Sequence, residues 1–188
     1  YMGTDNGILI YNYRTDRYEQ PATDFPTDVR TMALQGDTLW IGALNGLYTY
    51  QLQNRKLSPL GTKRNGLPHN TIYSIIRTGD NQIYVGTYNG LCRYIASNGK
   101  FEKIPLPVNS SQSNLFVNSL LEDTGRQCIW IGMEGSLFQY TPATGLMKPI
   151  DAFHNNSIKS LALDGDGNLL AGTDNGLYVY QNDNGTLQ

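Results

Sequence analysis

A nine-residue segment that starts with glycine and ends with tyrosine occurs five times in the chain, and this repeat limits the fold more than any other feature. The first glycines of successive copies lie 39, 44, 46 and 40 residues apart. Repeats of this length, each holding four short strands, are typical of propeller blades. The sequence therefore predicts an all-β chain, a β-propeller fragment built of four-stranded antiparallel blades. The copies start at Gly3, Gly42, Gly86, Gly132 and Gly172 and end at Tyr11, Tyr50, Tyr94, Tyr140 and Tyr180.

Each repeat divides into four predicted strands, A to D, with A nearest the propeller axis and D at the rim. The turn between strands B and C carries Asn-Gly in four copies, which predicts a type I′ hairpin with positive φ at both residues. The copy with Gly135-Ser136 suits a type II′ turn. Strand D is followed closely by proline, which fits an outer edge strand because such a strand can spare a backbone donor. The inner strands A are predicted to begin at Val29, Ile72, Val117 and Ile158.

The repeat boundaries predict one partial propeller over residues 1–188, with whole blades at about 26–60, 68–106 and 114–150. Partial blades are predicted at about 1–25 and 156–188. Propellers close with about four to eight blades, so we expect this chain to be a fragment of a larger propeller. Open blade edges offer unpaired backbone and apolar surface, and we therefore predict self-association of the chain.

The composition excludes several classes of partner. The formal net charge is −2 and Lys and Arg do not cluster, so no nucleic-acid partner is predicted. No apolar run approaches the roughly 20 residues of a membrane span, and none is predicted in this chain. Cys92 and Cys128, like the two histidines, show no metal-ligand spacing. The sequence therefore predicts no metal and no cofactor.

Several stretches resemble the two-component regulator propeller repeat, and the resemblance covers essentially the whole chain. It is carried by the hairpin segments 38–50, 81–91 and 165–177 and by segment 66–75, which leads into a new blade. Two departures are structural in kind. Gly135-Ser136 stands in place of Asn-Gly, and residues 169–171 lack the aromatic residue of strand B.

This resemblance implies a setting and a function. Such repeats are typical of the periplasmic sensor region of hybrid two-component system histidine kinases in gut Bacteroides-type bacteria. The resemblance implies a parent protein anchored in the inner membrane, a kinase outside this chain, and an oligosaccharide ligand. It also implies that this chain is not itself an enzyme and has no catalytic residues. The repeat motif consists of scaffold positions, so it transfers no ligand-binding residue to this sequence.

Aromatic residues two positions before the repeated glycine could form a platform on which sugar rings stack. Trp40, Tyr84 and Trp130 occupy this position. Their constant register beside an apolar neighbour favours the alternative, which is packing between blades in the core. The same argument assigns the tyrosines that close each copy to the scaffold.

Two other motifs resemble sites but fit simpler roles. Residues 164–168 look like the start of a calcium loop, but Leu169 and Asn175 stand where the EF-hand pattern needs Gly and Glu. We therefore predict a plain turn between strands A and B. His69 and His154 lie in loops between blades without a nucleophile or zinc pattern, and surface positions are predicted for both.

Within a repeat, columns that differ between copies mark binding positions better than columns that agree. The most variable column near the start of strand A holds Arg30, Tyr73, Asn118 and Lys159, which we predict as ligand-binding residues. The alternative is that these side chains are solvated or line a polar channel. Loops on one propeller face commonly form the binding surface. The loops before strand A vary as well, at residues 24–28, 63–70, 109–114 and 151–156.

The leading hypothesis is a ligand-sensing module of a hybrid histidine kinase, with an oligosaccharide as the ligand. The ligand would change the relation between propeller subunits and so bias the kinase equilibrium. A protein-protein interaction scaffold is the alternative. A propeller glycosidase or lyase is a third hypothesis, but it needs paired carboxylates, and the repeat offers no acid pair at a privileged position. The fold alone cannot choose between these functions.

Overall fold

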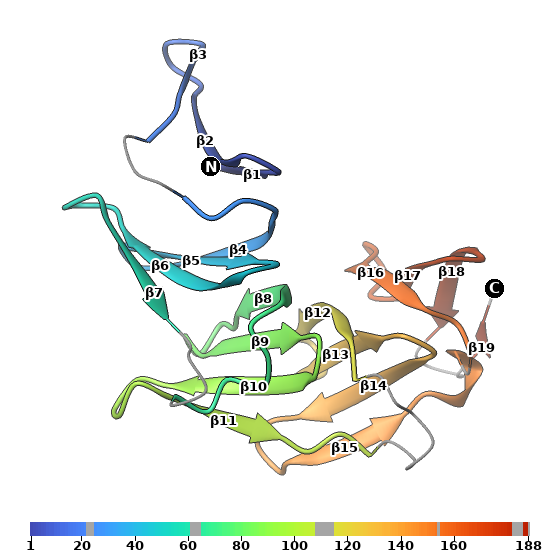
Figure 1. The fold of residues 1–188 in the computed structure, drawn as a ribbon. Coiled ribbons are helices and arrows are strands. Elements are labelled where there is room, and N and C mark those ends of the chain that lie inside the picture. The colour runs from blue at the N-terminus through green and yellow to red at the C-terminus, as the bar shows by residue number, and fades with distance from the viewer. Residues whose placement is uncertain (22–24, 61–64, 108–114, 154, 182–185, 188) are drawn as a thin grey trace.

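The computed structural model describes residues 1–21, 25–60, 65–107, 115–153, 155–181 and 186–187. In these ranges the strands form five antiparallel sheets that stand side by side in an arc (Figure 1). We number the sheets as blades 1 to 5 in chain order. Each blade is a meander in which consecutive strands are neighbours.

The strands of each blade have the following bounds. Blade 1 contains β1 (Met2–Thr4), β2 (Gly7–Asn12) and β3 (Arg17–Glu19), and blade 2 contains β4 (Val29–Gln35), β5 (Thr38–Ala43), β6 (Gly46–Gln51) and β7 (Lys56–Leu60). Blade 3 contains β8 (Ile72–Arg77), β9 (Ile83–Thr87), β10 (Gly90–Ile95) and β11 (Lys100–Ile104). Blade 4 contains β12 (Val117–Asp123), β13 (Cys128–Met133), β14 (Ser136–Thr141) and β15 (Leu146–Pro149), and a short 3-10 helix, η2 (Asp151–Phe153), follows it. Blade 5 contains β16 (Ile158–Leu163), β17 (Leu169–Thr173), β18 (Gly176–Gln181) and β19 (Thr186–Leu187).

The first strands of blades 2 to 5 lie on the inside of the arc and pack against one another in chain order, from β4 to β16 (Figure 1). Small hydroxylated residues join them. The backbone N–H of Ile75 donates to Thr31 Oγ1 at 3.1 Å, and Ser74 Oγ donates to the Val117 carbonyl at 3.2 Å. The prediction of an all-β propeller fragment with four-stranded antiparallel blades is confirmed.

The hairpins between the second and third strands differ from the prediction. In blade 3, Thr87 pairs with Gly90, so Tyr88 and Asn89 are the central residues of the turn. The Thr87 hydroxyl donates to the Gly90 carbonyl at 2.8 Å and accepts from the Asn89 amide at 3.1 Å. None of the hairpin asparagines, all of which are described, has positive φ, whereas Gly90 has a φ of 109°. The type I′ prediction was wrong because the strand pairing puts the asparagine second in the turn and the glycine after it. Blade 2 has the same turn, in which Ala43 pairs with Gly46.

The corresponding hairpin of blade 4 is shifted in the same way. Met133 pairs with Ser136, so Glu134 and Gly135 are the central residues. Gly135 has a φ of 80° at the second central position, as a type II turn requires. The type II′ prediction, which put Gly135 first, was therefore wrong.

Neighbouring blades bury the same columns against each other. The second residue of strand C, which is β2 in blade 1 and the third strand in blades 2 to 4, is at most 2% exposed. This residue is Ile8, Leu47, Leu91 and Leu137 in turn. Trp40, Tyr84 and Trp130 are also buried in these interfaces. The core interpretation of the three strand B aromatics is confirmed, and they do not form a stacking platform.

Blade 5 is the last blade of the described arc. Leu177, which shares the column of Leu91, is 68% exposed because no described blade follows it. The sheet nevertheless has four strands, since β19 pairs Thr186 with Gln181 and Leu187 with Tyr180. The sequence analysis missed β19 because this two-residue strand has no proline after it. Among the described residues, no helix has the length and apolar character that a membrane crossing needs.

Candidate functional site

The four predicted ligand-binding residues share one structural position. In blades 2 to 5 the pairing between the first and second strands slips by one residue directly after the first residue of the inner strand. The unpaired residue forms a β-bulge, which bends the strand and redirects its side chain. The residues at these bulges are Arg30, Tyr73, Asn118 and Lys159.

All four bulges lie at the same end of the inner strands, which is also the end that holds the hairpins between the second and third strands. We call this end the bulge end. Arg30 and Lys159 are exposed, and Tyr73 and Asn118 are half-buried. Tyr73 and Asn118 flank the hydrogen bond between Ser74 and Val117, so these two come from directly adjacent strands. Each blade thus presents a different side chain at an equivalent place.

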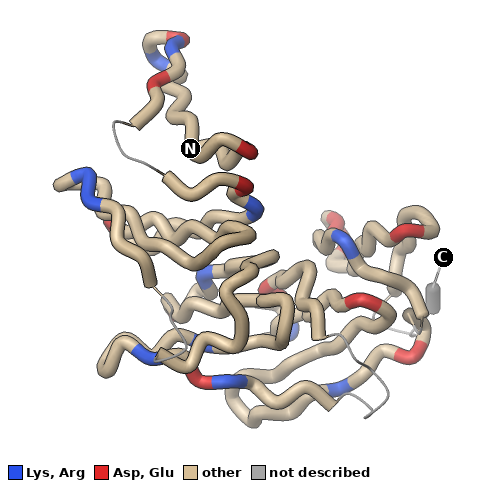
Figure 2. The backbone as a smooth tube through the Cα atoms, in the orientation of Figure 1, with Lys and Arg blue, Asp and Glu red and all other residues tan. Residues whose placement is uncertain are grey.

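Both signs of charge occur at the bulge end. Lys159 Nζ donates to Ser157 Oγ at 2.8 Å, and the Ser157 backbone N–H donates to Asp174 Oδ1 at 3.1 Å. Asp28 directly precedes the strand that carries Arg30. Along the described residues, Lys and Arg are interspersed with Asp and Glu (Figure 2). Acidic and basic side chains thus lie close together at the bulge end.

The structure also reveals a row of aromatic rings at the bulge end that the sequence analysis did not find. Tyr88 lies 4.0 Å from Phe116 and 4.9 Å from His69, measured between ring centroids. Phe116 in turn lies 5.8 Å from the bulge residue Tyr73. Only the variation between repeats could have revealed this row. Tyr88 occupies a hairpin position that holds Asp5, Leu44, Glu134 and Asp174 in the other copies.

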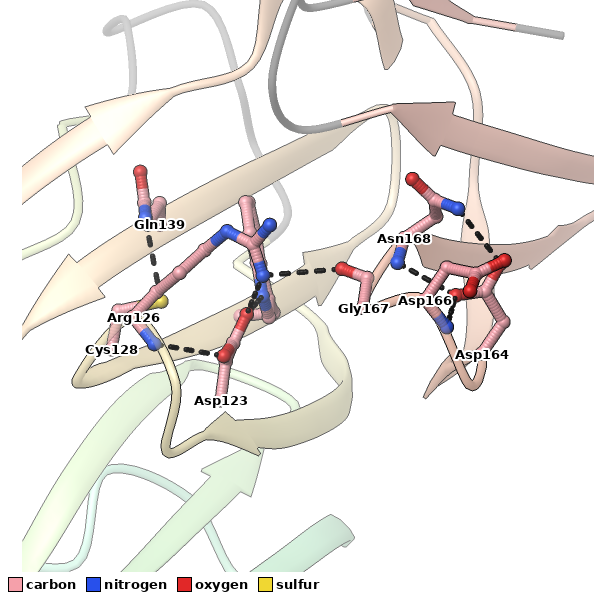
Figure 3. A network of polar contacts seen from close by, with 9 residues as sticks. Asp123, Arg126, Cys128, Gln139, Asp164, Asp166, Gly167 and Asn168 are labelled. Atoms are coloured by element: carbon pink, nitrogen blue, oxygen red, sulfur yellow. Dashed lines mark hydrogen bonds and ion pairs between the residues drawn. The ribbon is translucent and has the colours of Figure 1, made fainter.

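The opposite end of the blades, which we call the turn end, holds the turns between the first and second strands. Arg126 in the turn of blade 4 reaches blade 5, where its Nη1 donates to the Gly167 carbonyl at 3.1 Å (Figure 3). The same Nη1 donates to the buried Asp123 at 3.2 Å, and Trp130 Nε1 donates to the same carboxylate at 3.1 Å. These bonds tie adjacent blades together and leave the Asp123 carboxylate fully occupied.

The calcium-like segment also lies at the turn end. Asp164 Oδ1 accepts the backbone N–H groups of Asp166 and Asn168 at 3.0 and 2.8 Å, and Oδ2 accepts the Asn168 side chain at 2.9 Å (Figure 3). The hydrogen bonds from Asn168 and the backbone hold the pKa of Asp164 below its usual value. Because the carboxylate caps its own turn, the prediction of a plain turn is confirmed. No group of His, Cys, Asp and Glu side chains within the described ranges could hold a metal ion.

A cleft of about 640 Å³ opens at the turn end between blades 3 and 4. Its lining includes Tyr84, Arg93, Glu122 and Gln127, and none of the four bulge residues lines it. Glu122 accepts the Gly79 backbone N–H at 2.8 Å, and Arg93 pairs with Glu102 at 2.7 Å. Glu122 thus bonds blade 4 to blade 3, and Arg93 is paired within blade 3.

The remaining sequence candidates lie near the bulge end or outside the described residues. His69 is exposed, as predicted. His154 lies outside the described residues, and so do residues 24, 63–64 and 109–114 of the variable loops.

Stacked four-stranded blades define the β-propeller fold. In this chain the inner strands of the blades also carry the variable bulge residues. Residues 66–89 match the family model of the two component regulator propeller. These residues run from the loop before β8 to the hairpin after β9. Residues 66–89 therefore carry the two-component regulator propeller repeat, which confirms the resemblance seen in the sequence.

The chain is similar over its whole length to the extracellular domain of BT4673 from B. thetaiotaomicron, with 83% identity and a TM-score of 0.95. Solved structures of that domain describe BT4673 as a putative one component system and as a putative hybrid two component system. The chain spans 26% of the length of that structure. It is therefore homologous to about a quarter of an extracellular domain.

A more distant likeness shows the fold alone. The extracellular domain of the putative hybrid two component system BT3049 from B. thetaiotaomicron shares 18% identity with a TM-score of 0.76, over 99% of this chain and 27% of that one. No curated protein matches the chain. The BT4673 match is an extracellular domain, in agreement with the prediction that this chain is not itself an enzyme.

Proposed function

We propose that this chain is part of the periplasmic ligand-sensing region of a hybrid two-component system and that its bulge end binds an oligosaccharide. The observation that carries this proposal is the clustering of variation. The scaffold columns repeat from blade to blade, whereas the bulge residues Arg30, Tyr73, Asn118 and Lys159 all differ and all lie at one end of the inner strands. The similarity to the extracellular domain of BT4673 supports a sensory setting.

The mechanism follows from the way in which the blades are joined. Ser74 and Thr31 bond successive inner strands directly beside the bulges, and Arg126 bonds successive turns at the other end. A ligand that contacts bulge residues of two blades would favour one relative placement of those blades. Such a ligand can shift a signalling equilibrium only by its difference in affinity for the two placements. The kinase that reads this shift would lie outside this chain.

The test is isothermal titration of the chain with a panel of short oligosaccharides of glucose, mannose, xylose and galactose and with sulfated and uronic-acid fragments. We expect one class to bind and the variants Arg30→Ala and Asn118→Ala to bind it more weakly. Arg77→Ala, at the far end of an inner strand, is the control. A chain that is folded but binds no member of the panel would refute the proposal. Binding together with cleavage would point to the glycosidase or lyase alternative.

A further inference from the structure

The aromatic row at the bulge end is built from three separate segments of the chain. His69 comes from the loop before β8, Tyr88 from the hairpin between β9 and β10, and Phe116 from the residues before β12. Tyr88 contacts Phe116 edge to face, with an interplanar angle of 86°, and inclines by 34° to the His69 ring. Tyr73 meets the other side of Phe116 at 87°. The rings thus run outward from the inner strand in a connected row.

Backbone hydrogen bonds fix these segments to one another. The Tyr88 N–H donates to the Thr71 carbonyl at 3.0 Å, and the Gly90 N–H donates to the Leu115 carbonyl at 2.9 Å. The Thr71 hydroxyl donates to the Leu44 carbonyl of blade 2 at 3.0 Å. Three blades therefore hold the rings in place, and a ligand would find the surface already formed, with little ordering left to do on binding.

Core packing does not explain these aromatic residues. Tyr88 is 40% exposed and His69 is exposed, and among the described residues none of the four rings belongs to a hydrophobic cluster between blades. The repeat itself does not require them either. The position of Phe116 is filled in the other blades by Asp28, Thr71 and Ser157. The scaffold thus tolerates small or polar residues at these positions, and blades 3 and 4 differ from the other blades in having rings there.

The orientation of the histidine adds a polar function to the row. His69 Nδ1 accepts the Thr71 backbone N–H at 3.0 Å, so in this arrangement the ring proton lies on Nε2. Nε2 makes no hydrogen bond within the described residues and is left as a donor. A partly exposed aromatic ring beside a fixed N–H donor suits a ligand that has an apolar face and a hydroxylated edge.

We propose that the exposed rings of Tyr88 and His69 form a stacking site for one pyranose ring of a neutral oligosaccharide. The C–H face of the sugar would lie on Tyr88, and His69 Nε2–H would donate to a hydroxyl of the same ring. Phe116 acts as a positioning residue, because its edge-to-face contact supports the Tyr88 ring. Neutral sugars are favoured because the four rings of the row, Tyr73, Phe116, Tyr88 and His69, carry no formal charge at pH 7. This inference rests on the proposed function and assigns it a subsite.

The test uses the neutral oligosaccharide that binds the chain most tightly in the titration panel. We expect Tyr88→Ala to weaken binding about fivefold to tenfold, and Tyr88→Phe to retain it, because stacking uses the ring and not the hydroxyl. His69→Ala should weaken binding about threefold to tenfold through the lost hydrogen bond. Tyr13→Ala, which removes a more exposed ring on blade 1, should leave binding unchanged.

A second measurement does not depend on any variant. Aromatic NMR signals of Tyr88 and His69 should shift when the unmodified chain is titrated with the same oligosaccharide, and signals of Tyr13 should not. If the oligosaccharide binds but these shifts are absent, or Tyr88→Ala binds normally, the stacking site is refuted and the sensing proposal stands. If the folded chain binds no oligosaccharide at all, both proposals fail.

Discussion

The contact between the repeated glycine and the next blade gives the sharpest prediction about the fold. A Cβ atom added at Gly86 would lie 2.6 Å from Val117 Cγ1 and 2.8 Å from the Val117 carbonyl, and it would also collide with the Ser74 hydroxyl. Val117 is fully buried, and its carbonyl accepts the Ser74 hydroxyl. Gly86→Ala must therefore push blade 4 away from blade 3 at the inner wall.

The size of the effect follows from two losses. Overpacking a buried contact costs about 1–3 kcal/mol, and the hydrogen bond between Ser74 and Val117 contributes about 1 kcal/mol. We expect Gly86→Ala to lower the free energy of unfolding by about 2–4 kcal/mol. In a chain of 188 residues each kcal/mol shifts Tm by about 2–4 °C, so Tm should fall by about 5–15 °C.

Gly172→Ala is the matched control because it changes the same column of blade 5. Its Cβ would collide only with the Ser160 hydroxyl of its own blade, which can rotate away, and the next atoms are at 3.8 Å or more. The alanine also gains about 0.5–1 kcal/mol from reduced backbone entropy in the unfolded chain. Differential scanning calorimetry should show little change or a small rise in Tm. Equal destabilisation by the two variants, or none by either, would refute the proposed packing between blades.

Three other predictions test the surface, a buried thiol and an interblade bond. Leu177→Lys should reduce the self-association that we expect of the exposed blade faces, as measured by light scattering, whereas Leu91→Lys should prevent folding because its column is buried. Burial raises the pKa of the Cys92 thiol, so iodoacetamide should not modify it in the folded chain. The free energy of unfolding should also fall as pH rises above about 8.5, because the thiol then ionises in the unfolded chain and not in the folded one. Arg126→Ala should lower the free energy of unfolding measured in urea by about 1–3 kcal/mol, because the buried Asp123 loses a charged partner. A monodisperse unmodified chain would count against the first of these predictions, a reactive Cys92 against the second and an unchanged urea midpoint against the third.

Much of the fold could be predicted from the sequence because a repeat supplies several copies of the same evidence. The constant register of Trp40, Tyr84 and Trp130 was enough to assign them to the core, and their burial confirms it. The hairpin type, in contrast, could not be predicted from the repeated motif. Asn-Gly favours a type I′ turn by itself, but Thr87 pairs with Gly90 and Ala43 with Gly46, so the turn lies one residue earlier than the motif predicts. The register of the strand pairing, which the two-residue motif does not contain, decided the geometry.

The candidate site was only partly accessible from the sequence, and the reason is geometric. A β-bulge leaves no gap in the repeat, so the column that contains Tyr73 looks like any other strand position until the pairing is known. Its variability was visible, but the redirected side chain was not. The aromatic row was less accessible still, because His69, Tyr88 and Phe116 become neighbours only when the hairpin of one blade bonds to the segments that lead into two inner strands. Comparing copies within the repeat singles out positions that differ, whereas a site assembled from several loops requires the distances between them. The bulge column and the aromatic row both lie at the bulge end of the inner strands. A ligand that stacks on Tyr88 would therefore also lie within reach of the bulge column.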